Sequence, residues 1–424
     1  MSKIVVAHAG KQHSFKTAEA LVAGGYEVHY ITTVYDKKGS VTNIAKKILG
    51  KSNLKRANSR KSENLKDSHV VQFYEVLGLT SLLLMRIDKK RTIYTWWNKR
   101  LYELFSKRVA KYCLKNGIEI LIMYDGQAHE AFEILKNKKI VKILDMSAAS
   151  LPFMKKIYEK DMQINPRFSS NLKKYSDFIF DRDNQKNSIK EIELSDSLLV
   201  PSEFSKRTLA GLTTENTPIF LNPYGFDKSN DNVYSKISQE KKDGVVSLIY
   251  TGSVNQRKGI SYLLEAVDAI RQRFTDIEIN LKLLGIYDKE DEAIRDYLNK
   301  FSFLGLVTKD KVKEELMVSD LFIFPSLSDS FSFSVIEALS LGVPVICSDN
   351  TGAADFISNG VNGYVFKTQN KQELINILEY YISDLSRLKE LKKTTIKRAK
   401  ALDNTWDKYN RILLKIIEEV KSYE

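Results

Sequence analysis

The chain has 424 residues and a net charge of +13, and 43% of its residues are hydrophobic and 28% charged. This composition excludes a disordered or collagen-like chain, and the length predicts two or three domains. Cys113 and Cys347 are its only cysteines, which excludes a disulfide framework and favours a reducing compartment.

Strands alternate with helices through the first half of the chain. We predict strands over 3–7, 27–33, 118–124, 139–144, 197–200 and 218–222, and helices over 15–23, 98–116, 129–137 and 202–211. Residues 36–64 are polar and basic, which indicates an irregular excursion or exposed helices, and a long, mostly helical region runs through Ser195. The alternation predicts a doubly wound parallel sheet.

Residues 222–227 (NPYGFD) and the polar stretch 228–244 form the expected linker, and beyond it the alternation starts again. We predict strands over 245–250, 278–284, 321–324 and 343–347, and helices over 260–273, 291–300, 312–318, 333–340 and 371–381. Two parallel sheets imply two domains, 1–225 and 245–400, that face each other across a cleft. Ligands in such sheets bind beyond the carboxyl ends of the strands.

The N-terminus starts a strand almost at once, which leaves no room for a signal peptide. The longest nearly apolar run, 76–85, is shorter than the roughly 20 residues that span a bilayer. We therefore expect a cytoplasmic protein.

The positive charge is concentrated in residues 46–111, which hold 17 lysines and arginines against five acids, a net +12. Leucines, Trp96 and Trp97 are interleaved with these cations. The combination favours a peripheral contact with an anionic membrane, such as the inner face of the plasma membrane. The alternative is a solvated helix face over ordinary core residues. Nucleic acid is not expected as a partner, because no nucleic-acid-binding module accompanies the charge.

Residues 250–264 (YTGSVNQRKGISYLL) contain the first motif with chemistry. A strand ends at Gly252, a short loop carries Arg257 and Lys258, and Gly259 opens a helix. Glycine lets the backbone approach a ligand closely, and two cations beside a helix N-terminus favour a diphosphate. Such a loop can equally be a solvated turn.

Residues 324–346 (FPSLSDSFSFSVIEALSLGVPVI) contain the second motif. A buried strand is followed by the serine-rich loop 330–334, which offers hydroxyl and N–H groups to an anion at a helix start. Glu337 lies eight residues after Asp329 and can reach a ribose diol. Alternatively, Asp329 caps the helix and Glu337 is a surface charge.

With these two segments the chain resembles the retaining family-4 glycosyltransferases of the GT-B fold (glycosyl transferases group 1). The spacing of Asp329 and Glu337 and the continuation 337–345 (EALSLGVPV) match that family's acidic motif. Further similar segments are 200–206 (VPSEFSK), 222–227 (NPYGFD), 359–365 (NGVNGYV) and 405–409 (TWDKY). The resemblance covers most of residues 197–424 and is loose in the first half.

The resemblance implies two Rossmann-like domains and a last helix, within 401–424, that crosses back to the first domain. It implies that Arg257 and Lys258 bind the donor diphosphate and that Glu337 binds the ribose. Other implied donor-binding positions are Gly10, Gly252, Leu306, Val307, Ser332, Phe333 and Ser334. Asp329 would contact the transferred sugar and, with Lys258, belong to the catalytic set.

Three positions depart from the family pattern. Asp329 stands where Glu is commoner, and its shorter reach bears on sugar choice. Ser332 replaces the usual Gly. Ser253 stands where many relatives have Arg, which leaves Arg257 and Lys258 as the principal cations.

The first domain is expected to hold the acceptor, with Lys11, Gln12 and His13 as candidates in its first loop. Either Asp125 or His129 would be the site residue that follows strand 118–124, and each has a structural alternative. His13 can also simply cap a helix. We interpret Asp181-Arg-Asp183 as structural rather than as a metal motif.

We therefore expect a retaining hexosyltransferase without a metal or other cofactor, which moves a sugar from a UDP- or GDP-linked donor. The expected acceptor is a surface polysaccharide or glycolipid, lipid-linked in the simplest case. Fixed cations and N–H dipoles can stabilise a departing nucleotide without a metal. The rivals are a sugar-nucleotide epimerase or phosphorylase of the same fold, and a non-catalytic nucleotide-sugar-binding protein.

Overall fold

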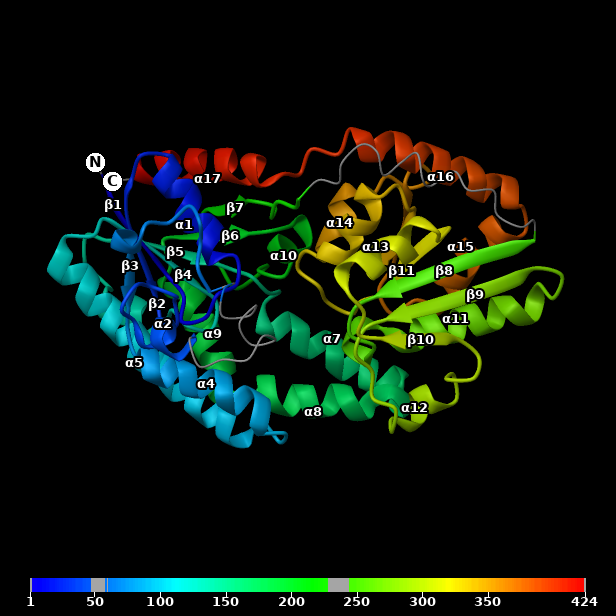
Figure 1. Ribbon diagram of the computed structural model, residues 1–424, viewed down its shortest axis with the longest axis horizontal. Helices are drawn as coiled ribbons and strands as arrows, with labels where there is room; N and C mark the ends of the chain where they lie inside the picture. Colours follow the sequence, from blue (N-terminus) through cyan, green and yellow to red (C-terminus); the bar gives the residue numbers. More distant parts are fainter. Residues whose placement is uncertain (1, 47–57, 59, 228–243, 423–424) are drawn as a thin grey trace.

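The computed structural model describes residues 2–46, 58, 60–227 and 244–422, and it shows two parallel α/β domains side by side (Figure 1). The first sheet has seven strands in the order β3-β2-β1-β4-β5-β6-β7. Its strands are β1 (Lys3–Ala7), β2 (Glu27–Thr32), β3 (Val70–Gln72), β4 (Ile120–Tyr124), β5 (Val141–Asp145), β6 (Ser197–Val200) and β7 (Ile219–Leu221).

The second sheet has six strands in the order β10-β9-β8-β11-β12-β13. They are β8 (Val245–Thr251), β9 (Glu278–Leu284), β10 (Ser302–Gly305), β11 (Leu321–Phe324), β12 (Val345–Ser348) and β13 (Gly363–Phe366). Neighbouring strands in both sheets run parallel. The predicted doubly wound, two-domain fold is confirmed.

Helices connect the strands of each sheet. In the first half they are α1 (Ser14–Ala23), α2 (Val41–Lys46), η1 (Asp67–His69), α4 (Glu75–Ile87), α5 (Thr92–Asn116), α6 (His129–Ile134), α7 (Leu151–Ile164), η2 (Pro166–Phe168), α8 (Ser169–Ile179), α9 (Arg182–Leu194) and α10 (Glu203–Arg207). In the second half they are η4 (Gln256–Lys258), α11 (Ile260–Arg273), α12 (Glu292–Arg295), α13 (Lys309–Met317), α14 (Phe333–Ser340), η5 (Gly352–Phe356), α15 (Lys371–Ile382), α16 (Leu385–Lys400) and α17 (Trp406–Lys421).

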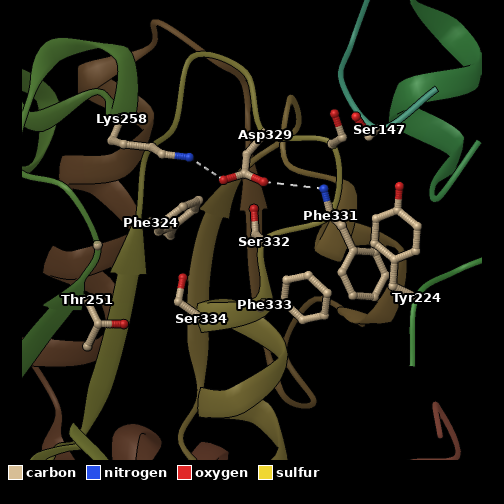
Figure 2. Close-up of a pocket in the computed structure, with 12 residues that line it drawn as sticks. Ser147, Tyr224, Thr251, Lys258, Phe324, Asp329, Phe331, Ser332, Phe333 and Ser334 are labelled. Atoms are coloured by element: carbon tan, nitrogen blue, oxygen red, sulfur yellow. Dashed lines mark hydrogen bonds and ion pairs between the residues drawn. The ribbon is translucent and has the colours of Figure 1, made fainter. Parts of the chain in front are cut away.

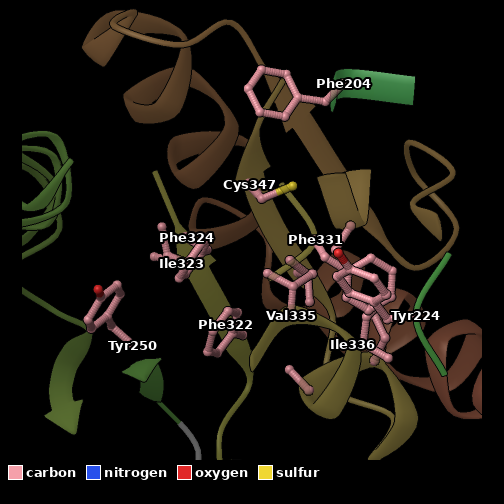
Figure 3. Close-up of a cluster of buried hydrophobic side chains, with 14 of the residues drawn as sticks. Phe204, Tyr224, Tyr250, Phe322, Ile323, Phe324, Phe331, Val335, Ile336 and Cys347 are labelled. Atoms are coloured by element: carbon pink, nitrogen blue, oxygen red, sulfur yellow. The ribbon is translucent and has the colours of Figure 1, made fainter. Parts of the chain in front are cut away.

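The core of the second domain lies around β11, whose four residues are all buried. Phe322 and Phe324 stack with ring centroids 6.0 Å apart, and Val335 and Ile336 of α14 cover the same strand (Figure 3). A short, continuous apolar run is typical of a strand that is covered on both faces. For this reason the sequence predicted both ends of β11 correctly, and the predicted ends of α14 were correct as well.

Three elements between β2 and β4 were not predicted: β3, η1 and α4. Strand β3 has only three residues, too few to show alternation. Helix α5 starts six residues before the predicted position 98, and α12 is shorter than the predicted helix 291–300. Residues 47–57 and 59 of the basic segment, and 228–243 of the predicted linker, lie outside the described residues.

Helices α7 and α8 form an arm that reaches from the first sheet to the second domain (Figure 1). Arg167 at the turn of the arm pairs with Asp296, and Gln369 donates a hydrogen bond of 3.0 Å to the Ile157 carbonyl. The rings of Phe168 and Tyr297 are 6.4 Å apart. The arm therefore packs on the second domain, although its sequence lies within the first half.

The C-terminal helix α17 lies beside α1 of the first domain (Figure 1). The Tyr409 hydroxyl is 2.9 Å from Thr17 Oγ1, and Tyr26 bonds Glu418 near the end of the helix. The chain thus crosses between the domains more than once. In the part of the chain that the structure describes, no helix is both long and apolar enough to cross a bilayer.

Candidate functional site

A pocket of about 260 Å³, here called the interdomain pocket, lies between the two domains at the carboxyl ends of β8 and β11. The second domain supplies most of its lining: Thr251, Gly252, Lys258, Phe324, Asp329, Ser330, Phe331, Ser332, Phe333 and Ser334. Ser147 and Tyr224 come from the first half of the chain and line its other side (Figure 2). The two sequence motifs therefore meet in one site.

Lys258 and Asp329, which both line this pocket, form an ion pair (Figure 2). Lys258 Nζ also lies 5.4 Å from the centre of the Phe324 ring. Burial would raise the pKa of Asp329, but the Lys258 ammonium outweighs it and holds that pKa below its ordinary value. Asp329 is therefore ionised, and Lys258 is a fixed cation whose charge an incoming anion can share.

Two glycines allow the loop 252–259, here called the donor loop, to pack against its neighbours. Gly259 has φ +68°, and a Cβ there would lie 1.8 Å from the Pro325 carbonyl oxygen. Gly252, with φ +143°, lines the pocket itself. Both conformations favour glycine, and Gly259 fixes the loop of Lys258 against the strand end that carries Asp329.

The serine-rich segment forms the start of α14. Ser332 has φ +63°, a left-handed conformation, and it lies where the family pattern has Gly. The first N–H groups of an α-helix have no partner within the helix, so the segment Ser332–Ser334 offers donors to an anion. Asp329 does not cap α14: the N-cap position is Ser332, and the helix has no side-chain cap. The Asp329 carboxylate instead accepts a hydrogen bond of 3.3 Å from Phe331 N in the preceding loop.

Three buried hydroxyls that line the interdomain pocket lack a hydrogen-bond partner within the described residues. They are Tyr224 OH, Thr251 Oγ1 and Ser332 Oγ. Buried polar groups in folded proteins are nearly always satisfied, and an unsatisfied one is costly. Three of them around one ion pair mark a place where a polar ligand fits.

Glu337 lies on the exposed face of α14 and does not line the pocket. Because it follows Phe333 by four residues and Ser334 by three, it lies on the same face of the helix as these two pocket residues. Partial burial raises its pKa, against the opposing effect of Lys309 and Lys313. Leu306 and Val307 also lie outside the lining, and Leu306 is 76% exposed after β10.

Arg257 does not line the pocket either, since its guanidinium is held by the arm. It donates a hydrogen bond of 3.0 Å to Tyr175 OH and stacks 4.6 Å from that ring. The preceding Gln256 is buried and donates a bond of 2.6 Å to Asp161 of α7. The arm thus holds the donor loop from outside, which no sequence signal predicted.

The first loop, with Gly10, Lys11 and Gln12, is tied back into its own domain. Gly10 N donates a bond of 2.7 Å to His8 Nδ1, and His8 Nε2 lies 3.1 Å from Gln127. Lys11 lies 5.4 Å from the Phe15 ring, and Gln12 is exposed with φ +35°. None of the three predicted residues lines the interdomain pocket.

His13 precedes α1, but its side chain does not cap that helix. Its Nε2 is 2.8 Å from Asp145 Oδ2, and its ring packs 4.2 Å from the ring of Tyr224. Because Tyr224 lines the interdomain pocket, His13 stands directly behind the pocket wall.

Asp125 and His129 line a second cavity of about 470 Å³, here called the lateral pocket, between α5, α6 and α9. Both ring nitrogens of His129 are buried without a hydrogen-bond partner among the described residues. Burial raises the pKa of Asp125, which accepts hydrogen bonds of 2.8 and 2.6 Å from Ser147 N and Oγ. Since Ser147 lines the interdomain pocket, this pair forms a wall between the two cavities.

The lateral pocket also contains Glu191, a buried carboxyl that the sequence did not reveal. It accepts hydrogen bonds from the backbone N–H groups of Gly126, Ala128 and His129, at 2.8, 2.6 and 3.0 Å. Burial raises its pKa to about 8 despite these donors. Glu191 therefore fixes the loop that presents Asp125 and His129.

Asp181 and Asp183 have structural partners. Asp181 caps α9 and accepts bonds of 2.9 Å from the N–H groups of Asp183 and Asn184. Asp183 pairs with Lys99 at 2.6 Å. Asp181 thus caps a helix, and Asp183 pairs with a neighbouring helix.

Besides Glu191, sequence reasoning missed Ser147, Tyr175 and Tyr224. Tyr224 lies within the NPYGFD segment, whose pattern assigns no role to its side chain. Ser147 and Tyr175 stand in no motif, and only the folded chain brings them to the donor loop and the pocket.

Solved structures confirm the fold class that this geometry defines. Sucrose-phosphate synthase from Thermosynechococcus elongatus superposes with a TM-score of 0.66 and 14% identity, covering 100% of both chains. Anabaena HepE in complex with UDP superposes with a TM-score of 0.55 and 16% identity, again over the full length of both chains. The chain has the GT-B fold of glycosyltransferases.

Residues 234–401 match the family model of glycosyl transferases group 1. An uncharacterized glycosyltransferase of Methanocaldococcus jannaschii is 29% identical over 178 residues, which are 39% of this chain and 43% of the relative. A capsular polysaccharide biosynthesis glycosyltransferase of Staphylococcus aureus is 28% identical over 46% of this chain and 52% of its own length. The match of residues 234–401 to this family model agrees with the resemblance seen in the sequence.

The name of a further relative includes its acceptor. The N,N'-diacetylbacillosaminyl-diphospho-undecaprenol alpha-1,3-N-acetylgalactosaminyltransferase of Campylobacter jejuni is 27% identical over 30% of this chain and 33% of its own length. The chain thus matches only a third to a half of the length of these three curated relatives.

Proposed function

We propose that the protein transfers a sugar from a nucleotide diphosphate donor to a glycan or lipid-linked acceptor, with retention of configuration and without a metal. The observation that carries this proposal is the Lys258–Asp329 pair in the interdomain pocket, next to the start of α14. A cation and helix N–H groups suit a diphosphate, and a neighbouring carboxylate suits sugar hydroxyls.

The donor diphosphate would lie between Lys258 Nζ and the segment Ser332–Ser334. When the bond from the sugar to the phosphate breaks, negative charge grows on the leaving diphosphate, and these fixed groups stabilise it. Asp329 would accept hydrogen bonds from the sugar, and Glu337, further along α14, would accept them from the ribose. The solved complex of HepE with UDP supports a uridine donor, and GDP is the alternative.

The acceptor would approach from the first domain. With retention, the acceptor hydroxyl attacks on the face that the leaving group vacates, and a phosphate oxygen can take its proton. The lateral pocket, with Asp125 and His129, is the proposed acceptor site, and the Asp125–Ser147 pair separates it from the interdomain pocket that would hold the donor. The diphospho-undecaprenol acceptor in the name of the Campylobacter relative supports a lipid-linked acceptor.

A transfer assay tests this function. Purified protein is incubated with UDP- and GDP-linked hexoses and with diphospholipid-linked acceptors, with and without EDTA, and the new anomeric bond is read by NMR. We expect nucleotide release only with donor and acceptor together, unchanged rate in EDTA and a product with the anomeric configuration of the donor. Conversion of the donor into an isomeric nucleotide sugar without acceptor would favour the epimerase, and cleavage of a glycan by inorganic phosphate to a sugar 1-phosphate would favour the phosphorylase. Binding without turnover would favour the binding protein.

A further inference from the structure

The hairpin of α4 and α5 carries an apolar surface that the fold leaves uncovered. Its turn and the adjoining helix ends, residues 83–96, are here called the hairpin tip, and they project from the lower edge of the molecule in Figure 1. Ile87 is 62% exposed and Trp96 67%. The other exposed large apolar side chains of the tip are Leu83, Met85 and Ile93. A gathering of this kind in so short a segment marks an interaction surface.

The opposite side of the hairpin is buried in contacts between its two helices and with the first domain. Trp97 Nε1 donates a bond of 3.0 Å to the Leu77 carbonyl, and Ser81 bonds Asn98 across the two helices. At Gly78, a Cβ would come within 2.4 Å of Thr33 Oγ1, so α4 packs closely on the first domain there. The hairpin is thus held by its inner side, and folding does not explain the apolar residues of its tip.

Cations surround this apolar surface. The tip holds Arg86, Lys89, Lys90 and Arg91, all exposed, against the single acid Asp88, a net +3. Asp88 Oδ2 accepts a bond of 2.9 Å from Tyr94 N, which fixes the turn between the helices. The turn therefore presents its cations on an ordered scaffold.

We propose that the hairpin tip docks on the surface of an anionic lipid bilayer. The apolar side chains enter the boundary between headgroups and acyl chains, and the cations contact lipid phosphates. Projecting aromatic and aliphatic side chains beside lysine and arginine are the composition of peripheral membrane anchors. The charge complements an anionic surface, which is why we choose lipid over a protein partner.

Docking would bring the mouth of the lateral pocket to the bilayer. Arg91, Tyr94 and Thr95, at the tip, line this pocket, and Asp125 and His129 lie in the same lining. A lipid-linked acceptor could then enter the pocket while its lipid stays in the membrane. This last step rests on the proposed function, whereas the docking itself does not.

Vesicle sedimentation tests the docking without any nucleotide sugar. The full-length protein is mixed with vesicles of phosphatidylcholine, alone or with phosphatidylglycerol, at low and high salt. We expect binding to the anionic vesicles that weakens as salt rises, and little binding to the neutral ones. Trp96 emission should shift to the blue on binding, and Trp96→Phe should lose this shift.

Two variants test the apolar and the basic part of the tip, and the first has a matched control. Ile87→Glu should lose binding more than tenfold, whereas Ile286→Glu should not, because Ile286 is equally exposed at 61% but lies in the second domain. Lys89→Ala with Lys90→Ala should weaken binding roughly 25-fold, at about fivefold for each cation.

Several results would overturn the docking: no binding, equal binding to neutral vesicles, or equal loss in Ile286→Glu. If the protein does not bind vesicles but forms a dimer in lipid-free solution, and Ile87→Glu dissociates this dimer, the tip contacts a protein partner instead. None of these results bears on sugar transfer to a water-soluble acceptor, so failure here leaves the proposed transferase intact.

Discussion

The carboxyl ends of the two sheets use their loops differently. In the second domain, the loops after β8 and β11 bring Gly252, Lys258, Asp329 and Ser332 into one pocket. In the first domain, the loops after β1, β4 and β5 bond mainly to each other, as in the pairs His13–Asp145 and Asp125–Ser147. The edge of the second domain, here called the ligand-binding edge, gathers its polar groups around one pocket. The polar groups of the first-domain edge, here called the scaffold edge, mainly hold one another and form the wall beside the proposed acceptor site.

The largest effect is expected at the ligand-binding edge. Lys258→Ala should lower turnover about 10²- to 10³-fold, since it removes the fixed cation that stabilises the leaving diphosphate. The measurement is the steady-state rate of nucleotide release in the presence of acceptor. Lys300→Ala, which breaks a surface pair of 2.7 Å with Asp268, is the matched control and should keep the wild-type rate. A Lys258→Ala enzyme near that rate would show that the diphosphate binds elsewhere.

At the scaffold edge we expect an effect on the free energy of unfolding rather than on turnover. Burial lowers the pKa of His8 to about 3, so the native state keeps it neutral while the unfolded chain protonates near pH 6.5. As pH falls from about 6.5 to 3, the free energy of unfolding should therefore decrease, with a slope from this group of about 1.4 kcal/mol per pH unit. Urea unfolding at several pH values measures it. His8→Gln should flatten the slope in that window, and an unchanged slope would refute the assignment to His8.

The arm of α7 and α8 connects the two domains, and removal of the Tyr175 hydroxyl tests whether it positions Arg257. Tyr175→Phe keeps the ring on Arg257 but removes the hydrogen bond of 3.0 Å. A lost bond to a charged group predicts a donor KM roughly tenfold higher with little change in kcat. Tyr158→Phe is the control, because its hydroxyl is buried without a partner within the described residues. Equal effects of the two variants would deny Tyr175 a positioning role.

The smallest effect concerns Ser332, a non-glycine residue in the left-handed region. Ser332→Gly should raise the free energy of unfolding by about 1 kcal/mol, because the strained φ of +63° is easy for glycine. The same change removes a hydroxyl from the pocket, so the donor KM should rise a few-fold. Thermal unfolding and steady-state kinetics measure the two effects. A less stable Ser332→Gly protein would contradict the strain.

The comparison also explains what the sequence could predict. Strands such as β11 and helices such as α11 and α14 were located to the residue, because apolar runs and glycine or serine boundaries define them locally. Lys258, Asp329 and Ser332 were found because each follows a strand in a motif of fixed spacing. Strand β3 and helix α4 were missed because their type depends on tertiary packing, as at Gly78 against Thr33.

Site residues outside a motif could not be predicted from the sequence for the same reason. Tyr175 meets Arg257 only because the arm crosses to the second domain, a contact between residues 82 positions apart. Arg257 was predicted as a second phosphate cation, yet here it contacts the arm rather than the pocket. The candidates Asp125 and His129 do share a cavity, but it is the lateral pocket rather than the interdomain one.

Calorimetric titration with UDP and GDP tests most directly whether the interdomain pocket binds a nucleotide diphosphate. Wild-type protein and the Lys300→Ala control should bind one of the two nucleotides with a stoichiometry of one. Lys258→Ala should bind it at least tenfold more weakly, as expected for the loss of a charge-assisted contact to phosphate. Equal affinity in all three proteins, or no binding of either nucleotide, would contradict the assignment of this pocket to the donor.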